Sequence, residues 1–235
     1  MSKIGAVTLC LNDEATIGGT IRCLQGFVDY HIVLISEKSY FGDVYDNGLS
    51  EKICEKLGVD VLKGNWPLDH HQRTLGNKIC AQNGCDWVLT FDSDELMDAE
   101  NIKKLIEHTK TTKANALVVR PECYWKTIEY TLTPLPDYCP VIATRSTVKF
   151  PYIRNVDCNV ELTDVRMHHV SWAAPKDVYK KVTCYAHATD FDGKEWHEKH
   201  YKDWEYGQPA VLPDKTYGVN RNPLPEELVK CLITT

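Results

Sequence analysis

Apolar and polar positions in the first hundred residues alternate between the patterns of buried strands and of one-sided helices. Nearly continuous apolar runs at 4–11 and 30–35 predict strands buried on both faces. Between them, Ile17, Ile21 and Leu24 recur with the spacing of one helix face. The other predicted elements are helices near 49–57, 71–83 and 99–110 and strands at 59–62 and 87–91. This order indicates parallel βαβ units with right-handed crossovers, and therefore a doubly wound α/β sheet.

The pattern changes after residue 114. Short strand-like segments separated by Pro-rich turns are predicted at 116–120, 122–130 and 141–143. Helices are predicted from Pro175, a favoured first helical residue, and over 194–205. From residue 208 onward, four prolines favour a tail that wraps over the domain. We therefore expect three parts, with the boundaries 1–114, 115–207 and 208–235.

The end of the predicted strand at 87–91 carries the most informative chemistry. This apolar strand runs directly into Asp92, Asp94 and Glu95, in the sequence WVLTFDSDE. In an open α/β sheet, ligands bind just beyond the carboxyl ends of the strands. Two acids one residue apart at that place suit a hard divalent cation that also holds phosphate oxygens. The alternative is that Asp92, Ser93 or Asp94 caps the following helix.

Composition and charge narrow the class of protein. The chain of 235 residues is 43% hydrophobic and 26% charged, as in an ordinary globular protein, and its net charge of -6 gives no support to bulk electrostatic binding of nucleic acid or anionic membrane. No apolar run approaches the roughly 18 to 20 residues of a membrane span. The sequence enters a strand at once, which leaves no room for a signal peptide. Ten cysteines without a Cys-x-x-Cys pair predict reduced thiols, and we expect a cytoplasmic protein.

Four features, in order along the chain, resemble the family 2-like glycosyltransferases of the GT-A fold. Residues 11–14 (LNDE) are similar to the Asn-Glu motif after that family's first strand. Ser36 and Glu37 end the second strand, where the family places a polar residue against the base or ribose. The next segment resembles the family's Trp followed by an Arg/Asn helix start near the diphosphate, with Asn65, Trp66, Pro67, Gln72, Arg73 and Asn77. Residues 87–95 look like its Asp-x-Asp-Glu signature.

This resemblance implies a fold and a donor site. The fold would be a GT-A fold, with a Rossmann-like, mostly parallel central sheet and a C-terminal helical elaboration. Residues 1–114 would form the nucleotide-sugar-binding half, 115–207 the acceptor and catalytic half of the same domain, and 208–235 the tail. The residues implied to bind the donor are Asn12, Glu14, Ser36, Glu37, Arg73 and Asp92.

The resemblance also implies a metal, Mn²⁺ or Mg²⁺. Such a cation bridges the two phosphates, neutralises charge on the leaving diphosphate and positions the donor. Asp94 is the expected direct ligand, and Asp92 is expected at the ribose or at the metal or its water. The segment with His168 and His169 is similar to a His-His-x-Ser segment in a branch of the family. Neighbouring side chains on an extended segment point to opposite faces, so only one can face the site. We prefer His169 as a metal or phosphate contact, and a purely structural histidine is the alternative.

An inverting transfer needs a base that takes the proton of the acceptor hydroxyl. The family supplies a carboxylate upstream of the His segment, often in a His-Glu pair. The corresponding stretch at 154–161 (RNVDCNVE) lacks that pair. Asp157 is the first candidate and Glu161 the second, and for each the alternative is an exposed loop acid.

The leading hypothesis is a metal-dependent glycosyltransferase that uses a nucleotide-diphosphate sugar. Its acceptor would be a glycan or a hydroxymethylated DNA base of phage type. A DNA acceptor requires a clustered basic face, for which the candidates are Lys176, Lys180, Lys181, Lys194, Lys199 and Lys202. A sugar-nucleotide nucleotidyltransferase is disfavoured because the loop at 12–14 is acidic and lacks a basic residue to meet a triphosphate. A non-catalytic nucleotide-sugar-binding module is the third possibility, and the sugar, the nucleotide and the oligomeric state stay open.

Overall fold

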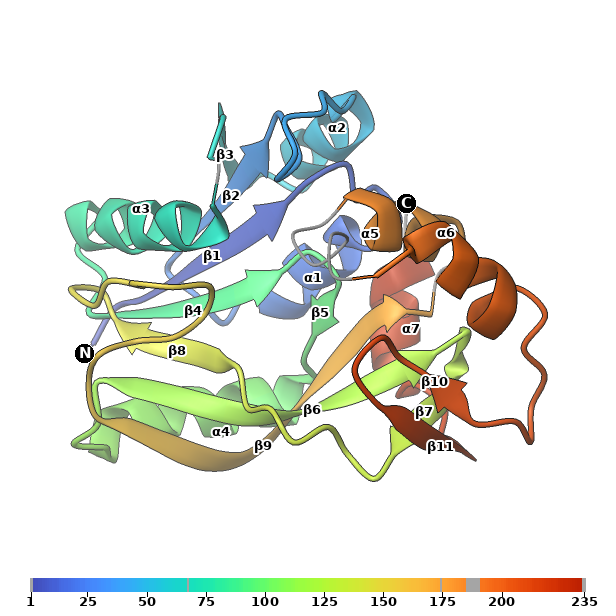
Figure 1. Ribbon diagram of the computed structural model, residues 1–235. Helices are drawn as coiled ribbons and strands as arrows, with labels where there is room; N and C mark the ends of the chain where they lie inside the picture. The colour runs from blue at the N-terminus through green and yellow to red at the C-terminus, as the bar shows by residue number, and fades with distance from the viewer. Residues whose placement is uncertain (1, 67, 174, 185–190, 234–235) are drawn as a thin grey trace.

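The computed structural model describes residues 2–66, 68–173, 175–184 and 191–233, which form a twisted central sheet with helices on both faces (Figure 1). The strands of its N-terminal half are β1 (Ile4–Cys10), β2 (Tyr30–Ser36), β3 (Asp60–Gly64) and β4 (Trp87–Asp92). They are parallel and lie in the order β3-β2-β1-β4. The helices between and after them are α1 (Ile17–Leu24), α2 (Gly48–Lys56), α3 (Asp69–Gln82) and α4 (Ala99–Thr111). The predicted strand and helix alternation is therefore confirmed.

Side-chain alternation along the buried strands assigns each helix to one face of this half. Ile32 and Leu34 of β2 belong to the apolar cluster that includes Cys80 of α3. Val33 and Ile35 point the other way and pack with α1 and α2. Strand β2 is thus apolar on both faces because a helix covers each face, whereas the edge strand β3 is mostly exposed.

Helix α3 lies unusually close to β1 at Gly76. A Cβ atom added there would stand 2.5 Å from Val7 Cγ1, which is far inside van der Waals contact. We expect Gly76→Ala to lower the free energy of unfolding by about 1 to 3 kcal/mol in urea denaturation, because α3 must move off the strand. The matched change Lys78→Ala, at an exposed position of the same helix, should stay within about 0.5 kcal/mol of the wild type. A Gly76→Ala variant more stable than the wild type would contradict this close packing.

The C-terminal half extends the same sheet, but most of its strand pairs are antiparallel. Its strands are β5 (Glu95–Leu96), β6 (Ala116–Trp125), β7 (Thr127–Thr133), β8 (Val141–Arg145), β9 (Val160–Trp172), β10 (Ala210–Val211) and β11 (Thr216–Arg221). The order continues from β4 through β8, β6, β7 and β11 to β10, and β9 runs parallel to β6. The sheet is therefore mixed, and only its N-terminal half has the mostly parallel character that we predicted. Parallel β9 was predicted only as an extended segment, because its first three residues are exposed and break the apolar alternation.

The helices of the second half, apart from the last, pack around the ends of β6 and β9. The helical segments of this half are α5 (Pro175–Cys184), α6 (Gly193–Trp196), a π-helical turn over His197–Tyr201, and α7 (Glu226–Ile233). Trp125 is the centre of an aromatic cluster, with ring contacts to Trp172, Trp196, Tyr201 and Trp204. The C-terminal stretch adds β11 to the edge strand β7 and places α7 against α1. In the part of the chain that the structure describes, no helix has the length and apolarity to cross a membrane.

His31, at the start of β2, should make stability depend on pH. Its Nε2 lies 2.9 Å from Thr8 Oγ1, and burial lowers the pKa of the ring from 6.5 to about 4. The unfolded chain binds the proton first as pH falls, so stability present above pH 6.5 is lost between pH 6.5 and 4. From pH 7 to pH 5 the wild type should lose about 1 to 2 kcal/mol more unfolding free energy than His31→Gln. Urea denaturation of both proteins measures this difference, and parallel pH curves would refute the assignment.

Candidate functional site

The carboxyl ends of β1, β2 and β4 meet at one edge of the sheet, and the predicted donor-binding residues follow them there (Figure 1). Buried Asn47 ties two of these strand ends together. Its side-chain oxygen accepts a hydrogen bond from the Asn12 N–H (2.6 Å), and its amide donates to the Ser36 carbonyl (2.9 Å). Asn12 adopts a left-handed conformation (φ 48°), which an Asn tolerates. No sequence pattern singled out Asn47, because a lone Asn before a helix is common.

The other donor candidates on these turns differ in exposure. Ser36 is buried, and its hydroxyl donates to the Lys38 carbonyl (2.8 Å). Glu14 and Glu37 are exposed at the same edge. Pro67, which the resemblance included, lies outside the described residues.

Asp92 is held by two arginines. Arg73 of α3 donates from Nη2 to both carboxylate oxygens, at 2.8 and 3.1 Å, and Arg154 Nη1 lies 3.5 Å from Oδ2. Burial opposes the charge on Asp92, but the two guanidinium groups hold its pKa below the ordinary value. Asp92 is therefore a fixed anion whose two oxygens already accept hydrogen bonds.

The Glu95 side chain contacts both Asp92 and Arg154. Its Oε2 accepts from the Asp92 N–H (2.9 Å) and from Arg154 Nη2 (2.9 Å). Arg154 also donates to the carbonyls of Thr90 (2.6 Å) and Val141 (2.8 Å). Sequence reasoning assigned Arg154 no role, since a lone Arg in a loop gives no signal. It anchors the loop before β9 to the end of β4.

The helix-cap alternative for the acidic cluster is wrong. Helix α4 begins at Ala99, and its cap is Asp98, whose Oδ1 accepts from the Asn101 N–H (2.8 Å). Strand β5 separates Asp92 and Asp94 from that helix. The two carboxylates are therefore free of any capping role at α4.

Asp94 meets a histidine and a lysine from distant parts of the chain. Strand β5 pairs with β9 so that Glu95 stands opposite His169, and the Val170 N–H donates to the Asp94 carbonyl (3.0 Å). His169 Nε2 lies 3.5 Å from Asp94 Oδ1, and Lys181 Nζ of α5 lies 3.5 Å from Oδ2. Burial opposes the charge on Asp94, but Lys181 and His169 hold its pKa far below the ordinary value. Burial likewise disfavours the charged His169, but Asp94 outweighs it and raises the pKa of His169 to about 10.

The two neighbouring histidines face opposite sides, as predicted. His169 has Tyr138 Oη 3.3 Å from its Nδ1, which fixes the ring with Nε2 toward Asp94. His168 points away, with Nδ1 3.0 Å from Tyr124 Oη and 3.4 Å from Glu122 Oε2. Only His169 of the pair lies beside Asp94.

Asp94 and His169 fit a metal ion whose remaining coordination positions are filled by the phosphates of the substrate and by water. Within the described residues, no three His, Cys, Asp or Glu side chains form a ready-made metal cage. Magnesium-type cations in nucleotide enzymes often take one or two protein ligands and fill the remaining positions with phosphates and water. The donor set of one carboxylate and one imidazole fits that arrangement once His169 releases the proton that it shares with Asp94, and the imidazole favours Mn²⁺.

The structure separates the two base candidates. Asp157 is exposed, in the same loop as Arg154. Glu161 lies near the start of β9, roughly 25 Å along the extended strand from His169. Its carboxylate accepts from Thr112 Oγ1 and stands 3.1 Å from His108 Nε2. Glu161 is therefore not brought to the carboxylate cluster.

Four of the six lysines considered for a basic face are engaged with oxygen atoms. Their partners are the Leu11 and Asn12 carbonyls for Lys180, Asp94 for Lys181, Glu195 for Lys199 and Glu198 for Lys202. The Lys176 side chain lies outside the described residues. These contacts give no support to a clustered basic face.

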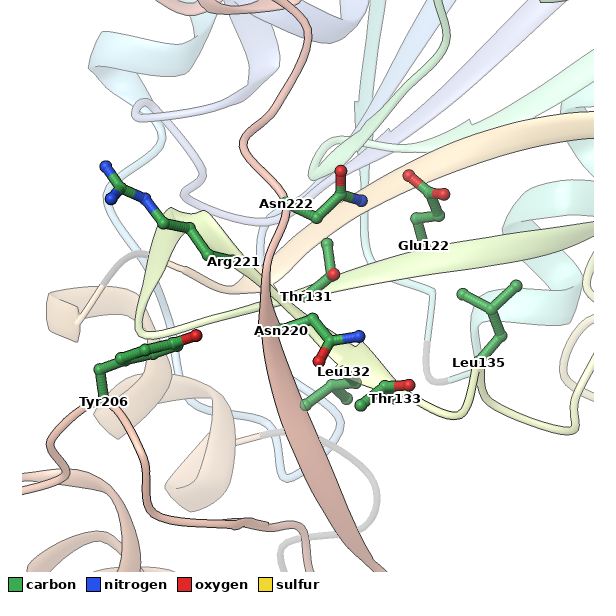
Figure 2. A pocket seen from close by; sticks show the side chains of 9 residues that line it. All are labelled: Glu122, Thr131, Leu132, Thr133, Leu135, Tyr206, Asn220, Arg221 and Asn222. Carbon is green, nitrogen blue, oxygen red and sulfur yellow. The ribbon is translucent and has the colours of Figure 1, made fainter.

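A groove of about 470 Å³ lies on the outer strands, apart from the acidic cluster (Figure 2). Five of its nine lining residues carry hydroxyl or amide side chains, and three of those five lie on β7 and β11. The lining comprises Glu122, Thr131, Leu132, Thr133, Leu135, Tyr206, Asn220, Arg221 and Asn222. None of these residues contributes to the arrangement around Asp94.

Comparison with known proteins gives the fold and no family. No protein-family model matches the sequence, and no curated protein matches it. Among solved structures, glucosyl-3-phosphoglycerate synthase from Mycobacterium tuberculosis, in complex with Mn²⁺, uridine diphosphate and glucosyl-3-phosphoglycerate, aligns with a TM-score of 0.51 at 17% identity over 94% of this chain and 88% of that one. S. aureus TarS 1-349 aligns with a TM-score of 0.48 at 17% identity over 76% of this chain. The chain spans 62% of the length of that TarS structure.

A nucleotidyltransferase is also similar in structure. CMP:2-keto-3-deoxy-manno-octonic acid synthetase in complex with CTP aligns with a TM-score of 0.41 at 11% identity, over 62% of this chain. At such low identities, similarity shows the fold alone. The strand order of the mixed sheet agrees with the first of these alignments. The chain therefore has the GT-A fold of nucleotide-sugar transferases, as predicted from the sequence.

Proposed function

We propose that this protein is a metal-dependent glycosyltransferase that moves a sugar from a nucleotide-diphosphate sugar to an acceptor hydroxyl. The observation that carries the proposal is the arrangement at Asp94. A partly buried, ionised carboxylate faces an imidazole and an ammonium at the strand edge where ligands of open α/β sheets bind.

The donor nucleotide is proposed to lie along the ends of β1, β2 and β4. The nucleoside would contact Asn12, Glu14, Ser36 and Glu37. The ribose would face Asp92, which Arg73 holds in place. Fixing a polar side chain before the donor arrives reduces the entropy lost on binding.

The chemistry at the diphosphate follows from charge. The leaving group of the donor is a nucleoside diphosphate, so positive charge near its phosphates lowers the barrier to sugar transfer. A Mn²⁺ or Mg²⁺ ion held by Asp94 and His169 would supply Lewis-acid stabilisation of that leaving group. Tyr138 keeps Nε2 of His169 turned toward Asp94, and so holds the two ligands in one place.

Asp157 is proposed as the base of an inverting displacement. Its loop is anchored at the acidic cluster through Arg154, and its carboxylate is exposed, as a group that meets an incoming acceptor must be. The acceptor classes are a glycan hydroxyl and a hydroxymethylated DNA base. The engaged lysines and the net charge of -6 favour the glycan.

A panel of nucleotide sugars tests the proposal. We expect one donor both to raise the melting temperature and to be hydrolysed slowly, with both effects requiring Mn²⁺ or Mg²⁺ and lost with a chelator. Release of pyrophosphate from a nucleoside triphosphate and a sugar phosphate would instead establish a nucleotidyltransferase. Stabilisation by a donor without any turnover, even with acceptors present, would establish a binding module. No response to any donor would refute the proposal.

A further inference from the structure

Asp94, the proposed metal ligand, already has a cation of the protein's own. Lys181 Nζ lies 3.5 Å from Oδ2, and the two side chains are only 24% and 19% exposed. An ion pair with this little solvent around it is screened far less than a surface pair. The position that a metal bound to Asp94 would take is therefore next to an ammonium group.

Helix α5 is held so that Lys181 reaches this point. The preceding Lys180 donates to the Leu11 carbonyl (3.0 Å) and the Asn12 carbonyl (2.6 Å), which fastens the helix to the turn after β1. Val178 and Val182 are buried in the aromatic cluster beneath the helix. These contacts place α5 across the carboxyl edge beside the ends of β1 and β4 (Figure 1).

A metal ion that binds at Asp94 alone is repelled by the positive charge already there. A metal ion that binds together with a diphosphate does not meet this repulsion to the same extent. A bare metal ion would find a carboxylate whose charge is already balanced, and beside it the ammonium of Lys181 and the protonated imidazole of His169, which both repel it. A diphosphate brings the missing ligands and also offers new oxygen anions to the displaced ammonium. Lys has a flexible stem and a point charge, which suits it to move between two such anions.

Resting on the proposed function, we propose that Lys181 exchanges between Asp94 and the diphosphate of the donor. In the donor-free enzyme it is the counterion of Asp94. When the metal and the nucleoside diphosphate bind together, the metal takes Asp94 and the Lys181 ammonium moves to the phosphate oxygens. Lys181 would then be a catalytic residue that stabilises the leaving group, and it would make the metal and the nucleotide bind cooperatively.

The exchange makes two opposite predictions for one substitution, Lys181→Met, which keeps most of the apolar stem. Mn²⁺ alone, titrated by the electron paramagnetic resonance of the free ion, should bind about fivefold more tightly or better, because no ammonium competes for Asp94. At saturating Mn²⁺, uridine diphosphate or guanosine diphosphate, titrated by calorimetry, should bind about fivefold more weakly or worse, because the phosphates lose a cation. Lys181→Arg should keep both wild-type affinities within about twofold.

Two controls separate the exchange from a general disturbance. Lys199→Met removes an exposed lysine paired with Glu195 on the turn after α6 and should change neither affinity. Adding Asp94→Asn to Lys181→Met should remove the gain in Mn²⁺ affinity. An unfolded Lys181→Met protein shows itself as a lost melting transition, and Lys181→Gln then takes its place.

Each outcome decides for or against the exchange. Unchanged or weaker Mn²⁺ binding by Lys181→Met overturns it, even if the diphosphate binds more weakly, since Lys181 is then only a phosphate contact. Tighter Mn²⁺ binding with unchanged diphosphate binding also overturns it, since Lys181 is then only a counterion. If the wild type binds no nucleoside diphosphate with any metal, the proposed function itself fails, and this result is separate from the Mn²⁺ comparison.

Discussion

Replacing Asp94 with Asn is expected to lower the rate of metal-dependent donor hydrolysis by about 10³-fold or more. The amide carries no charge and is a poor ligand for a hard cation. It also leaves His169 and Lys181, both 3.5 Å away, without the anion that they face. The measurement is kcat for the donor found in the panel, at saturating Mn²⁺, with the metal dependence recorded for both proteins.

Glu161→Gln is the matched control for this experiment. It makes the same carboxylate-to-amide change on a half-exposed residue near the other end of β9, where the partners are Thr112 and His108. We expect this variant to keep donor hydrolysis within about twofold of the wild type and to lose at most about 1 kcal/mol of stability. Wild-type hydrolysis by Asp94→Asn would remove the metal role of Asp94, and a large loss in Glu161→Gln would restore Glu161 as a base candidate.

Replacing Arg154 with Met is expected to cost about 3 to 5 kcal/mol of unfolding free energy. The Glu95 side chain is only 3% exposed and would keep its charge in the interior without its cation. The Thr90 and Val141 carbonyls would lose their donors as well. For a chain of this length, the melting temperature should fall by about 10 °C, and urea denaturation gives the free energy itself.

A double substitution shows whether the loss of unfolding free energy in Arg154→Met comes from the unpaired, buried carboxylate of Glu95. Arg154→Met combined with Glu95→Gln should recover part of the loss, because the buried carboxylate is then neutral. Arg221→Met is the surface control: its guanidinium is 73% exposed and lies 3.9 Å from Glu129. It should change stability by less than about 0.5 kcal/mol. An Arg154→Met protein as stable as the control would show that the network contributes nothing to folding.

Most of the N-terminal half could be predicted because its signals are local. The apolar runs of β1 and β2 and the helical spacing of Ile17, Ile21 and Leu24 each lie within a few residues of one another. Alternation of such elements restricts the topology to a few right-handed parallel arrangements. The second half gave weaker signals, since β6 pairs with three different strands and β9 begins with exposed residues.

The sequence by itself determined where the acidic cluster would lie, because an apolar strand fixes its own carboxyl end and an open sheet binds ligands there. Only the tertiary structure decided what each acid faces. Arg154 reaches Glu95, and His169 and Lys181 reach Asp94, through the pairing of β5 with β9 and the docking of α5. The physical reason is range: hydrophobic periodicity acts between neighbours in sequence, whereas charges find their partners only after distant strands have paired.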